Sequence, residues 1–363
     1  MQKILIIIIL LSSNSVLVLG LCPARCECDD EKLVVMCKAA HLDVVPITLN
    51  PELKELHLKS NQIKSIMSSF TVYHNLEYLD ISENSIVSVG RKNFAMQRKL
   101  RVLLIGSNHI SEVNNHSFHG LSSLQILHLN NNFIKKLPSR IFSGLNKLEK
   151  LDLSRNTISS ITQETFAGLI NLKTLLLRDN KLTAIPSESF AHLPNLVKLD
   201  LGINLLIEIP EFAFSSLASL EDLSIDICSV TSIQNNAFKH LDHLKSLKLQ
   251  DNDLEKIPQE AIETLKNLEE LILSNNKIKK VDSFALRGLK RLKIFAISNT
   301  DQLQTIDKNA FSENHFLQKL LIEFNKNLKN LDPGIFDSQS NSLKYISLRG
   351  NQFSHLHSHL VHW

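Results

Sequence analysis

The apolar residues of this chain follow one pattern that recurs from Leu53 to the C-terminus. Each copy carries leucine or a similar side chain at its first, fourth, sixth and eleventh positions, with asparagine at the ninth. The first leucine returns at one constant interval from Leu76 to Leu292, and the interval is slightly shorter before that stretch and slightly longer after it. A period of about 24 residues predicts a solenoid, because one unit cannot bury its own apolar face and must stack on copies. The first leucines are Leu53, Leu76, Leu100, Leu124, Leu148, Leu172, Leu196, Leu220, Leu244, Leu268, Leu292, Leu317 and Leu343.

Each copy is expected to begin with a short strand and a turn. Apolar residues alternate with polar ones at the fourth to sixth positions, which is the period of a strand with one buried face. Stacked copies therefore predict a parallel sheet. The ninth-position asparagine carries a donor and an acceptor, so a ladder of such amides would satisfy backbone groups at the turn. Cys228 and Thr300 replace this asparagine in two copies.

Regularly spaced phenylalanines predict a column of stacked aromatic side chains on the side of the stack away from the strands. The expected spine comprises Phe94, Phe118, Phe142, Phe166, Phe190, Phe214 and Phe238. Ile262 and Leu286 interrupt it, although Phe284 is close by. Because the spine makes its side wider, the stack must curve with its strands inside. The expected fold is an α/β solenoid with a concave parallel sheet and a convex side of loops or short helices.

This pattern resembles the typical class of extracellular leucine-rich repeats, with the consensus LxxLxLxxNxLxxLPxxxFxxLxx. Proline stands at the consensus position in four copies, as Pro138, Pro186, Pro210 and Pro258. The resemblance covers residues 53–363 and implies a horseshoe of thirteen repeats that binds a protein or peptide ligand on its concave face. Identical scaffolds of this kind carry unrelated partners, so the resemblance does not name the ligand.

Residues 1–20 are predicted to be a secretory signal peptide. Lys3 precedes an apolar run from Ile4 to Leu11, and Ser12 to Ser15 interrupt that run before it reaches the ~20 residues of a membrane span. The chain is therefore expected to be secreted and extracellular.

Residues 21–52 are expected to form a cysteine-rich cap. Four closely spaced cysteines after a secretory leader predict two disulfides, and their spacing alone leaves three pairings open. These residues are Cys22, Cys26, Cys28 and Cys37. The spacing resembles the N-terminal cap of secreted leucine-rich repeat proteins, and that resemblance implies the pairs Cys22–Cys28 and Cys26–Cys37.

The outward strand positions are the candidate binding surface, because folding does not use them. Two groups of these positions are apolar or aromatic, as at many protein-binding sites. The predicted partner-binding residues are Tyr78, Val102, Leu104, Ile126 and His128 in one group, and Ile272, Ile294, Leu321 and Tyr345, with Ala296, in the other. A mixed charged belt of Lys150, Asp152, Arg155, Arg178, Asp200, Asp222, Asp226 and Lys248 lies between them. The alternative is that these apolar side chains merely pack side by side.

Asn115 and Cys228 each have a functional and a structural interpretation. Asn115 begins the N-x-Ser sequence Asn115-His116-Ser117, which predicts a glycan on the outer side of the stack, unless the sequence is unused. The unpaired Cys228 is interpreted as a small buried hydrophobe in the asparagine ladder, against the alternative of a reactive thiol.

Two clusters offer weaker sites. A basic cluster is a possible contact for sulfated polysaccharide, or simply a solvated outer face, and comprises Lys277, Lys279, Lys280, Arg287, Lys290, Arg291 and Lys293. His355, His357 and His359 alternate near the C-terminus without an accompanying carboxylate or cysteine. No metal and no other cofactor is expected.

The overall composition favours a recognition protein. The formal net charge of +3 argues against a nucleic-acid partner. The sequence also lacks the GxSxG, HExxH and phosphate-binding glycine-loop motifs that would predict an enzyme. We expect a receptor-like or secreted binding protein without a membrane span, held together by disulfides and glycosylated. The alternative is a structural or adhesive protein that self-associates through its C-terminal edge, since no cysteine-rich C-terminal cap is present in the sequence.

Overall fold

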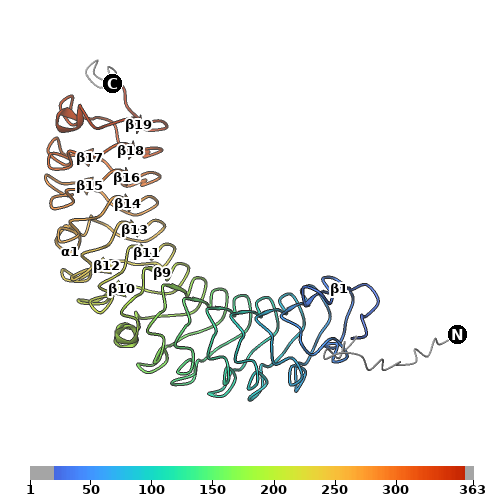
Figure 1. Cartoon of the computed structure of the whole chain (residues 1–363). Helices are drawn as coiled ribbons and strands as arrows, with labels where there is room; N and C mark the ends of the chain where they lie inside the picture. The colour runs from blue at the N-terminus through green and yellow to red at the C-terminus, as the bar shows by residue number, and fades with distance from the viewer. Residues whose placement is uncertain (1–19, 356–363) are drawn as a thin grey trace, which may run out of the picture.

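The chain is described by a computed structural model that covers residues 20–355. Residues 1–19 of the predicted signal peptide and the histidines at 357 and 359 lie outside the described residues. The described part is a curved stack whose main strands line the inner side of the arc (Figure 1). The predicted solenoid with a concave sheet is therefore confirmed.

The main sheet has fifteen strands in the order β1-β2-β3-β4-β5-β6-β7-β8-β9-β11-β13-β14-β16-β18-β19. They are β1 (Glu27–Asp29), β2 (Val34–Met36), β3 (Glu55–His57), β4 (Tyr78–Asp80), β5 (Val102–Leu104), β6 (Ile126–His128), β7 (Lys150–Asp152), β8 (Thr174–Leu176), β9 (Lys198–Asp200), β11 (Asp222–Ser224), β13 (Ser246–Lys248), β14 (Glu270–Ile272), β16 (Ile294–Ala296), β18 (Lys319–Leu321) and β19 (Tyr345–Ser347). From β3 onward, each strand begins shortly after one of the first leucines, and all pairs are parallel. Only β1 and β2 pair antiparallel.

The convex side consists of turns and a few short elements. These are the 3-10 helix η1 (Ser187–His192), the helix α1 (Gln259–Ile262) and the 3-10 helix η2 (Asp337–Gln339). Two small parallel sheets join β10 (Glu208–Ile209) to β12 (Ser232–Ile233), and β15 (Lys280–Val281) to β17 (Thr305–Ile306). The sequence pattern predicts loops and short helices here, and these small sheets are additional.

The predicted asparagine ladder ties each repeat to the one before it. Asn132 is buried, and its Nδ2 donates to the carbonyl oxygens of Ile105 at 3.2 Å and Leu129 at 3.0 Å. Its Oδ1 accepts from the amide of Ile110 at 3.0 Å. The same contacts recur around Asn156. The amide thus satisfies backbone groups that the turn would otherwise bury without a partner.

The aromatic spine is longer than predicted. Phe142 stacks between Phe118 and Phe166, with ring centroids 5.8 and 6.5 Å away. Phe70 extends the spine at its N-terminal end, and Phe311 and Phe336 extend it beyond the interruption. At the interruption itself Ile262 and Leu286 are fully buried. Phe284 does not fill the gap, because its side chain is 44% exposed.

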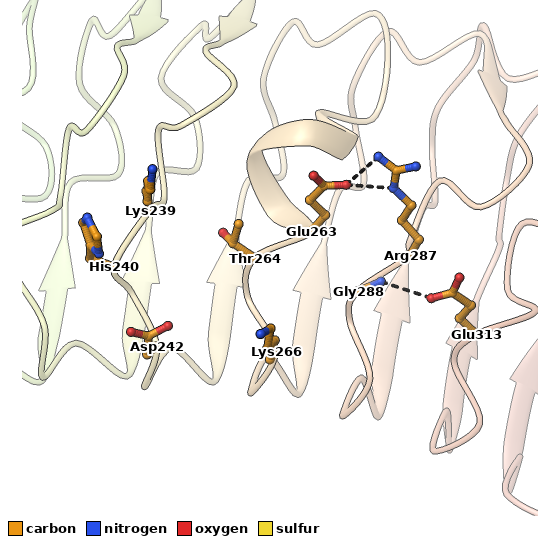
Figure 2. A pocket seen from close by; sticks show the side chains of 9 residues that line it. All are labelled: Lys239, His240, Asp242, Glu263, Thr264, Lys266, Arg287, Gly288 and Glu313. Carbon is orange, nitrogen blue, oxygen red and sulfur yellow. Dashed lines mark hydrogen bonds and ion pairs between the residues drawn. The ribbon is translucent and has the colours of Figure 1, made fainter.

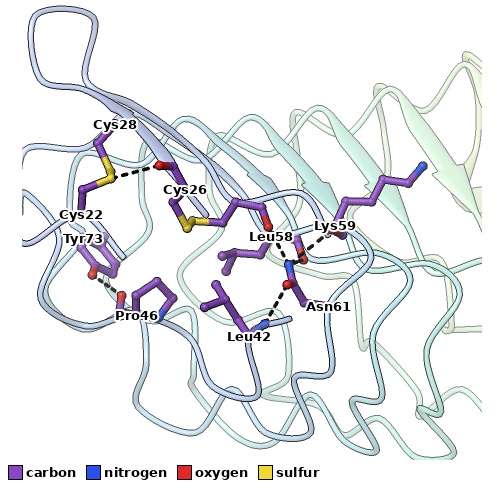
Figure 3. The surroundings of a disulfide bond; sticks show 10 residues. Cys22, Cys26, Cys28, Leu42, Pro46, Leu58, Lys59, Asn61 and Tyr73 are labelled. Atoms are coloured by element: carbon purple, nitrogen blue, oxygen red, sulfur yellow. Dashed lines mark hydrogen bonds between the residues drawn. A yellow bond between two sulfur atoms is a disulfide. The ribbon is translucent and has the colours of Figure 1, made fainter. Parts of the chain in front are cut away.

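The cysteine-rich segment covers the first repeat (Figure 3). Its disulfides join Cys22 to Cys28 and Cys26 to Cys37, the pairing that the resemblance implied. Asn61 links the segment to the repeats, since its Nδ2 donates to the Cys37 carbonyl at 2.7 Å and its Oδ1 accepts from the Leu42 amide at 2.9 Å. The cap therefore continues the ladder and shields the apolar edge of the first repeat.

Candidate protein-recognition surface

The first predicted group forms a continuous patch on strands β4, β5 and β6, here called the N-terminal patch. The strand register places Val102 between Tyr78 and Ile126, and it places Leu104 beside His128. All five side chains are partly exposed on the concave face, while the central residue of each strand is buried. The patch continues onto β3, where the His57 ring stacks on Tyr78 at a centroid distance of 4.6 Å.

Burial affects the two titratable rings of this patch, His128 and Tyr78. His128 Nε2 is buried and has no hydrogen-bond partner among residues 20–355. Burial, with a smaller contribution from Lys150, lowers the pKa of His128, so the ring is neutral at physiological pH. Burial also raises the pKa of Tyr78, helped by the nearby charges of Asp80 and Glu55. The patch therefore presents uncharged rings and aliphatic groups to a partner.

The second predicted group is less continuous. Ile272, Ala296 and Leu321 are neighbours in register, but Ala296 is only 3% exposed. In the other column Lys319 lies between Ile294 and Tyr345, and its Nζ sits 5.7 Å from the centre of the Tyr345 ring. A charge therefore divides this group, and the N-terminal patch is the larger uninterrupted apolar surface of the two.

The charged belt between the two groups is paired in its middle, at Arg178, Asp200, Asp222 and Asp226, whereas no ion pair within residues 20–355 involves its members Lys150, Asp152, Arg155 and Lys248. Arg178 reaches across one repeat to form two hydrogen bonds with Asp226, at 2.8 and 2.7 Å, and a longer contact of 3.4 Å with Asp200. Gly202 makes this crossing possible, because a Cβ there would lie 2.1 Å from Arg178 Nη1. Lys198 pairs with Asp222 at 3.0 Å. The sequence lined up Arg178, Gly202 and Asp226 in one column, but the pairing itself was not predicted.

Arg178 affects its two carboxylate partners differently. Burial raises the pKa of Asp226, but hydrogen bonds from Arg178 and Ser224 outweigh that effect, so its pKa lies below the usual value. The pKa of Asp200 is raised, because burial there is only partly offset by the Gly202 amide and the longer contact with Arg178. Asp226 is thus the ionised and nearly buried partner of Arg178, whose own side chain is 32% exposed.

The basic cluster is mostly neutralised by neighbouring carboxylates. Five of its seven residues form ion pairs: Lys277 with Asp253, Lys279 with Glu255, Lys280 with Asp282, Arg287 with Glu263 and Lys293 with Glu269. All five distances lie between 2.7 and 2.9 Å. A dense, unpaired basic surface of the kind that polysaccharide binding needs is therefore not formed by these residues.

Arg287 and Glu263 also line an open hollow of about 470 Å³ on the C-terminal half of the stack (Figure 2). Lysine, histidine, aspartate and glutamate side chains line it together, so charges of both signs alternate around its rim. The Glu313 carboxylate accepts from the Gly288 amide at 3.4 Å. This mixed lining selects no ligand class, and the hollow holds none of the predicted partner-binding residues.

Asn115 is exposed, but the Ser117 hydroxyl of the same N-x-Ser sequence forms hydrogen bonds within the fold. Ser117 is fully buried, accepts from the Asn114 amide at 3.0 Å and donates to the Gly90 carbonyl at 3.0 Å. Thr165, two repeats later, accepts from the Thr162 amide at 3.1 Å in the same way. The motif at Asn115 can therefore arise from repeat geometry alone, and its glycosylation stays a prediction.

Cys228 lies in the ladder. It is fully buried, and its Sγ faces the carbonyl oxygens of Leu201 and Asp226, each at 3.3 Å. Burial raises the pKa of its thiol to about 12, which leaves it protonated at physiological pH. These contacts favour the structural interpretation over a reactive thiol.

Sequence profiles of known families match most of the repeat region. A profile described as leucine rich repeat matches residues 74–132, 122–182 and 170–228, and one described as a BspA type leucine rich repeat region matches residues 207–344. The chain therefore belongs to the leucine-rich repeat family. Proteins of this kind mediate protein–protein recognition, and their solenoids are typically binding scaffolds without enzymatic activity.

Individual relatives share shorter or more distant similarity. The oligodendrocyte-myelin glycoproteins of Homo sapiens and Mus musculus are each 32% identical over 72 residues, which are 20% of this chain and 16% of the relative. The match thus spans less than a fifth of the length of these relatives. The crystal structure of an internalin from Listeria monocytogenes aligns with a TM-score of 0.66 and 23% identity, over 82% of this chain and 81% of that chain. The internalin shows a shared fold.

Residues 20–355 contain neither a candidate membrane span nor a candidate metal-binding cluster. None of the helices there has the length and hydropathy needed to cross a bilayer. That part of the chain also brings together no group of three or more histidine, cysteine, aspartate or glutamate side chains suited to a metal ion.

Proposed function

We propose that this chain is an extracellular recognition module that binds a protein partner through the N-terminal patch on its concave face. The single observation that carries the proposal is the run of partly exposed apolar and aromatic side chains formed by Tyr78, Val102 and Ile126, with Leu104 and His128 beside it. Asp80, the other outward residue of β4, is buried next to Leu104. Folding requires only the central residue of each strand to be buried, so these outward side chains are not needed for the core. Contiguous apolar surface with a polar rim is typical of interface centres.

Two further features support an extracellular protein partner. The disulfides of the cap form and persist in oxidising compartments, which agrees with the predicted secretory leader. The pairing of Arg178 with Asp226 neutralises two of the charges in the middle of the concave face. We expect affinity to come mainly from burying the N-terminal patch, as at hot spots rich in aromatic side chains.

The proposal is tested by screening the purified chain against an array of extracellular domains. Binding to any protein found should weaken more than tenfold in a Leu104→Ser/Ile126→Ser variant, because truncating central interface residues typically costs more than about 1.4 kcal/mol. Val87→Ser is the matched control, since Val87 is 58% exposed and lies outside the concave strands. A partner whose affinity falls with the control but not with the concave variant would contradict the proposal.

A further inference from the structure

A second apolar surface lies beside the concave face, on the turn that follows the strands. The residue before each ladder asparagine has a left-handed backbone in nearly every repeat, with φ between 52° and 59°. Most repeats carry serine, asparagine, aspartate or another polar residue there. Two adjacent repeats instead carry Ile203 (φ 53°) and Ile227 (φ 56°), and one later repeat carries Phe324 (φ 53°), which stands alone. The outward strand positions that were predicted as the binding surface do not include these residues.

Isoleucine is unfavourable at this position. A β-branched side chain crowds the backbone in the left-handed region, whereas asparagine and aspartate tolerate it. Burial offers Ile227 little compensation, because its side chain is 44% exposed. Ile203 and Ile227 therefore carry backbone strain that another residue type would avoid. Strained residues of this kind cluster at functional sites.

The apolar surface continues along the next residues of the seventh repeat. Leu205 is 50% exposed and Ile207 is 63% exposed, while Leu206 between them is buried. The two repeats are directly adjacent here, since the Ile203 amide donates to the Asp226 carbonyl at 2.8 Å. We call Ile203, Leu205, Ile207 and Ile227 the flank patch.

Carboxylates bracket the flank patch on both sides. Asp179 precedes Ile203 in the same column, and Asp251 follows Ile227. The Asp179 amide donates to the Gly202 carbonyl at 2.9 Å, and the Ile227 amide donates to the Gln250 carbonyl at 3.1 Å, so the four residues lie in consecutive stacked turns. Neither carboxylate forms an ion pair with residues 20–355, although Asp251 Oδ1 accepts a hydrogen bond from Asn275 Nδ2 at 2.6 Å.

We propose that the flank patch binds an extended protein segment in which two apolar side chains stand between two basic ones. Asp179 and Asp251 are three repeats apart, or about 15 Å at the ~4.8 Å spacing of paired strands. An extended chain covers that distance in four to five residues. Because successive side chains of an extended chain face opposite sides, the four side chains that face the patch occupy alternate positions, with Lys or Arg at the first and last and the apolar side chains on the isoleucines. The two basic residues are then six positions apart, or about 20 Å, and their long side chains reach inward to the two carboxylates. This surface is separate from the N-terminal patch and does not depend on it.

The test uses a phage-displayed library of random twelve-residue peptides, selected on the wild-type chain and depleted on an Ile203→Asn/Ile227→Asn variant. All proteins are produced in a host without N-glycosylation, because Ile227→Asn would create an N-x-Ser sequence with Cys228 and Ser229. The recovered peptides should carry the basic–apolar–apolar–basic pattern. They should bind the double variant and an Asp179→Asn/Asp251→Asn variant at least tenfold more weakly, and the carboxylate contribution should shrink as salt is raised. Val87→Asn serves as the control and should bind like the wild type.

Thermal unfolding of the same variant separates function from folding. Because asparagine suits the left-handed turn, Ile203→Asn/Ile227→Asn should keep or raise the melting temperature while it loses peptide binding. A lowered melting temperature would show that the isoleucines serve the fold and would overturn the proposal. Recovery of no discriminating peptide, or of peptides without the basic pair, would overturn it as well.

Discussion

Cys228 stands where eleven other repeats carry asparagine, and its thiol makes only part of the asparagine contacts. One repeat earlier, Asn204 Oδ1 accepts from the Leu182 amide at 3.0 Å, and Nδ2 donates to the carbonyls of Leu177 and Leu201. The thiol is a weak donor and a weak acceptor. The equivalent amide, Leu206, therefore has no comparable acceptor in Cys228.

Cys228→Asn should accordingly stabilise the protein by about 1 kcal/mol, because it restores a full set of ladder hydrogen bonds in a cavity of similar size. Asn204→Cys, the reverse change one repeat away, should destabilise by about 1–3 kcal/mol. Both values can be measured by denaturant unfolding. A Cys228→Asn variant less stable than the wild type would show that the ladder does not accept asparagine in this repeat.

The Arg178–Asp226 pair should matter more for stability than exposed ion pairs do. Arg178→Ala leaves the Asp226 carboxylate, whose side chain is 5% exposed, without its partner. We expect a loss of about 2–3 kcal/mol. Lys198→Ala removes a more exposed pair, in which the side chains are 46% and 28% exposed, and should cost less than about 1 kcal/mol. Equal losses in denaturant unfolding would contradict this ranking.

The same pair predicts a pH dependence of stability. Because the pKa of Asp226 is lower in the folded than in the unfolded chain, its ionised form stabilises the fold above the unfolded pKa of about 4, and this contribution is lost as the pH falls through the folded pKa. Asp226→Asn should therefore be less stable than the wild type at pH 7, with the difference shrinking below about pH 4. A difference that stays constant from pH 7 to pH 3 would exclude this linkage.

At the scale of elements, the cap should protect the first repeats and leave distant ones alone. The Cys26–Cys37 disulfide closes a segment of sequence separation 11, and Cys37 is fully buried against the first repeat. A Cys26→Ser/Cys37→Ser variant should lose about 2–3 kcal/mol. Its amides in β2, β3 and β4 should exchange hydrogen faster, while those in β9 to β14 keep their rates, because each repeat contacts only its neighbours.

The Cys22–Cys28 bond provides the control for that experiment. It closes a segment of sequence separation 6 at the exposed end of the cap. Cys22→Ser/Cys28→Ser should speed exchange in β1 and β2 only. Faster exchange across the whole sheet in either variant would mean that the stack unfolds as one cooperative unit.

The sequence predicted the strands and the ladder well because both depend on contacts that recur in the same way in every repeat. Elements that depend on two different repeats were harder to predict. Arg178 contacts Asp226 only because Gly202 lies between them, and the pattern of a single repeat does not contain that relation. The spine beyond Phe238 was missed because the repeat interval lengthens between Leu286 and Phe311, which shifts the phenylalanine out of the expected register. The flank patch was missed because only outward strand positions were considered as a binding surface, and its residues follow the strands.

At the scale of the whole molecule, the convex and concave sides of the stack differ in the contacts they hold. The convex side holds the aromatic spine and rows of ion pairs between repeats, such as Arg287 with Glu263. The inner side offers the N-terminal patch, and the edge beside it offers the flank patch. A long curved sheet can therefore present two candidate recognition surfaces without disturbing its core. The reason is that residues facing outward from the strands and turns are different residues from those that face the core.

The central claim is that the N-terminal patch contacts the protein partner. Hydrogen exchange measured on the complex with a partner found in the array tests it most directly. We expect slower exchange in residues 77–82, 101–106 and 125–130 of the bound chain, together with little change on the convex side. Protection confined to the convex side or to the flank patch, with β4 to β6 unchanged, would contradict the account.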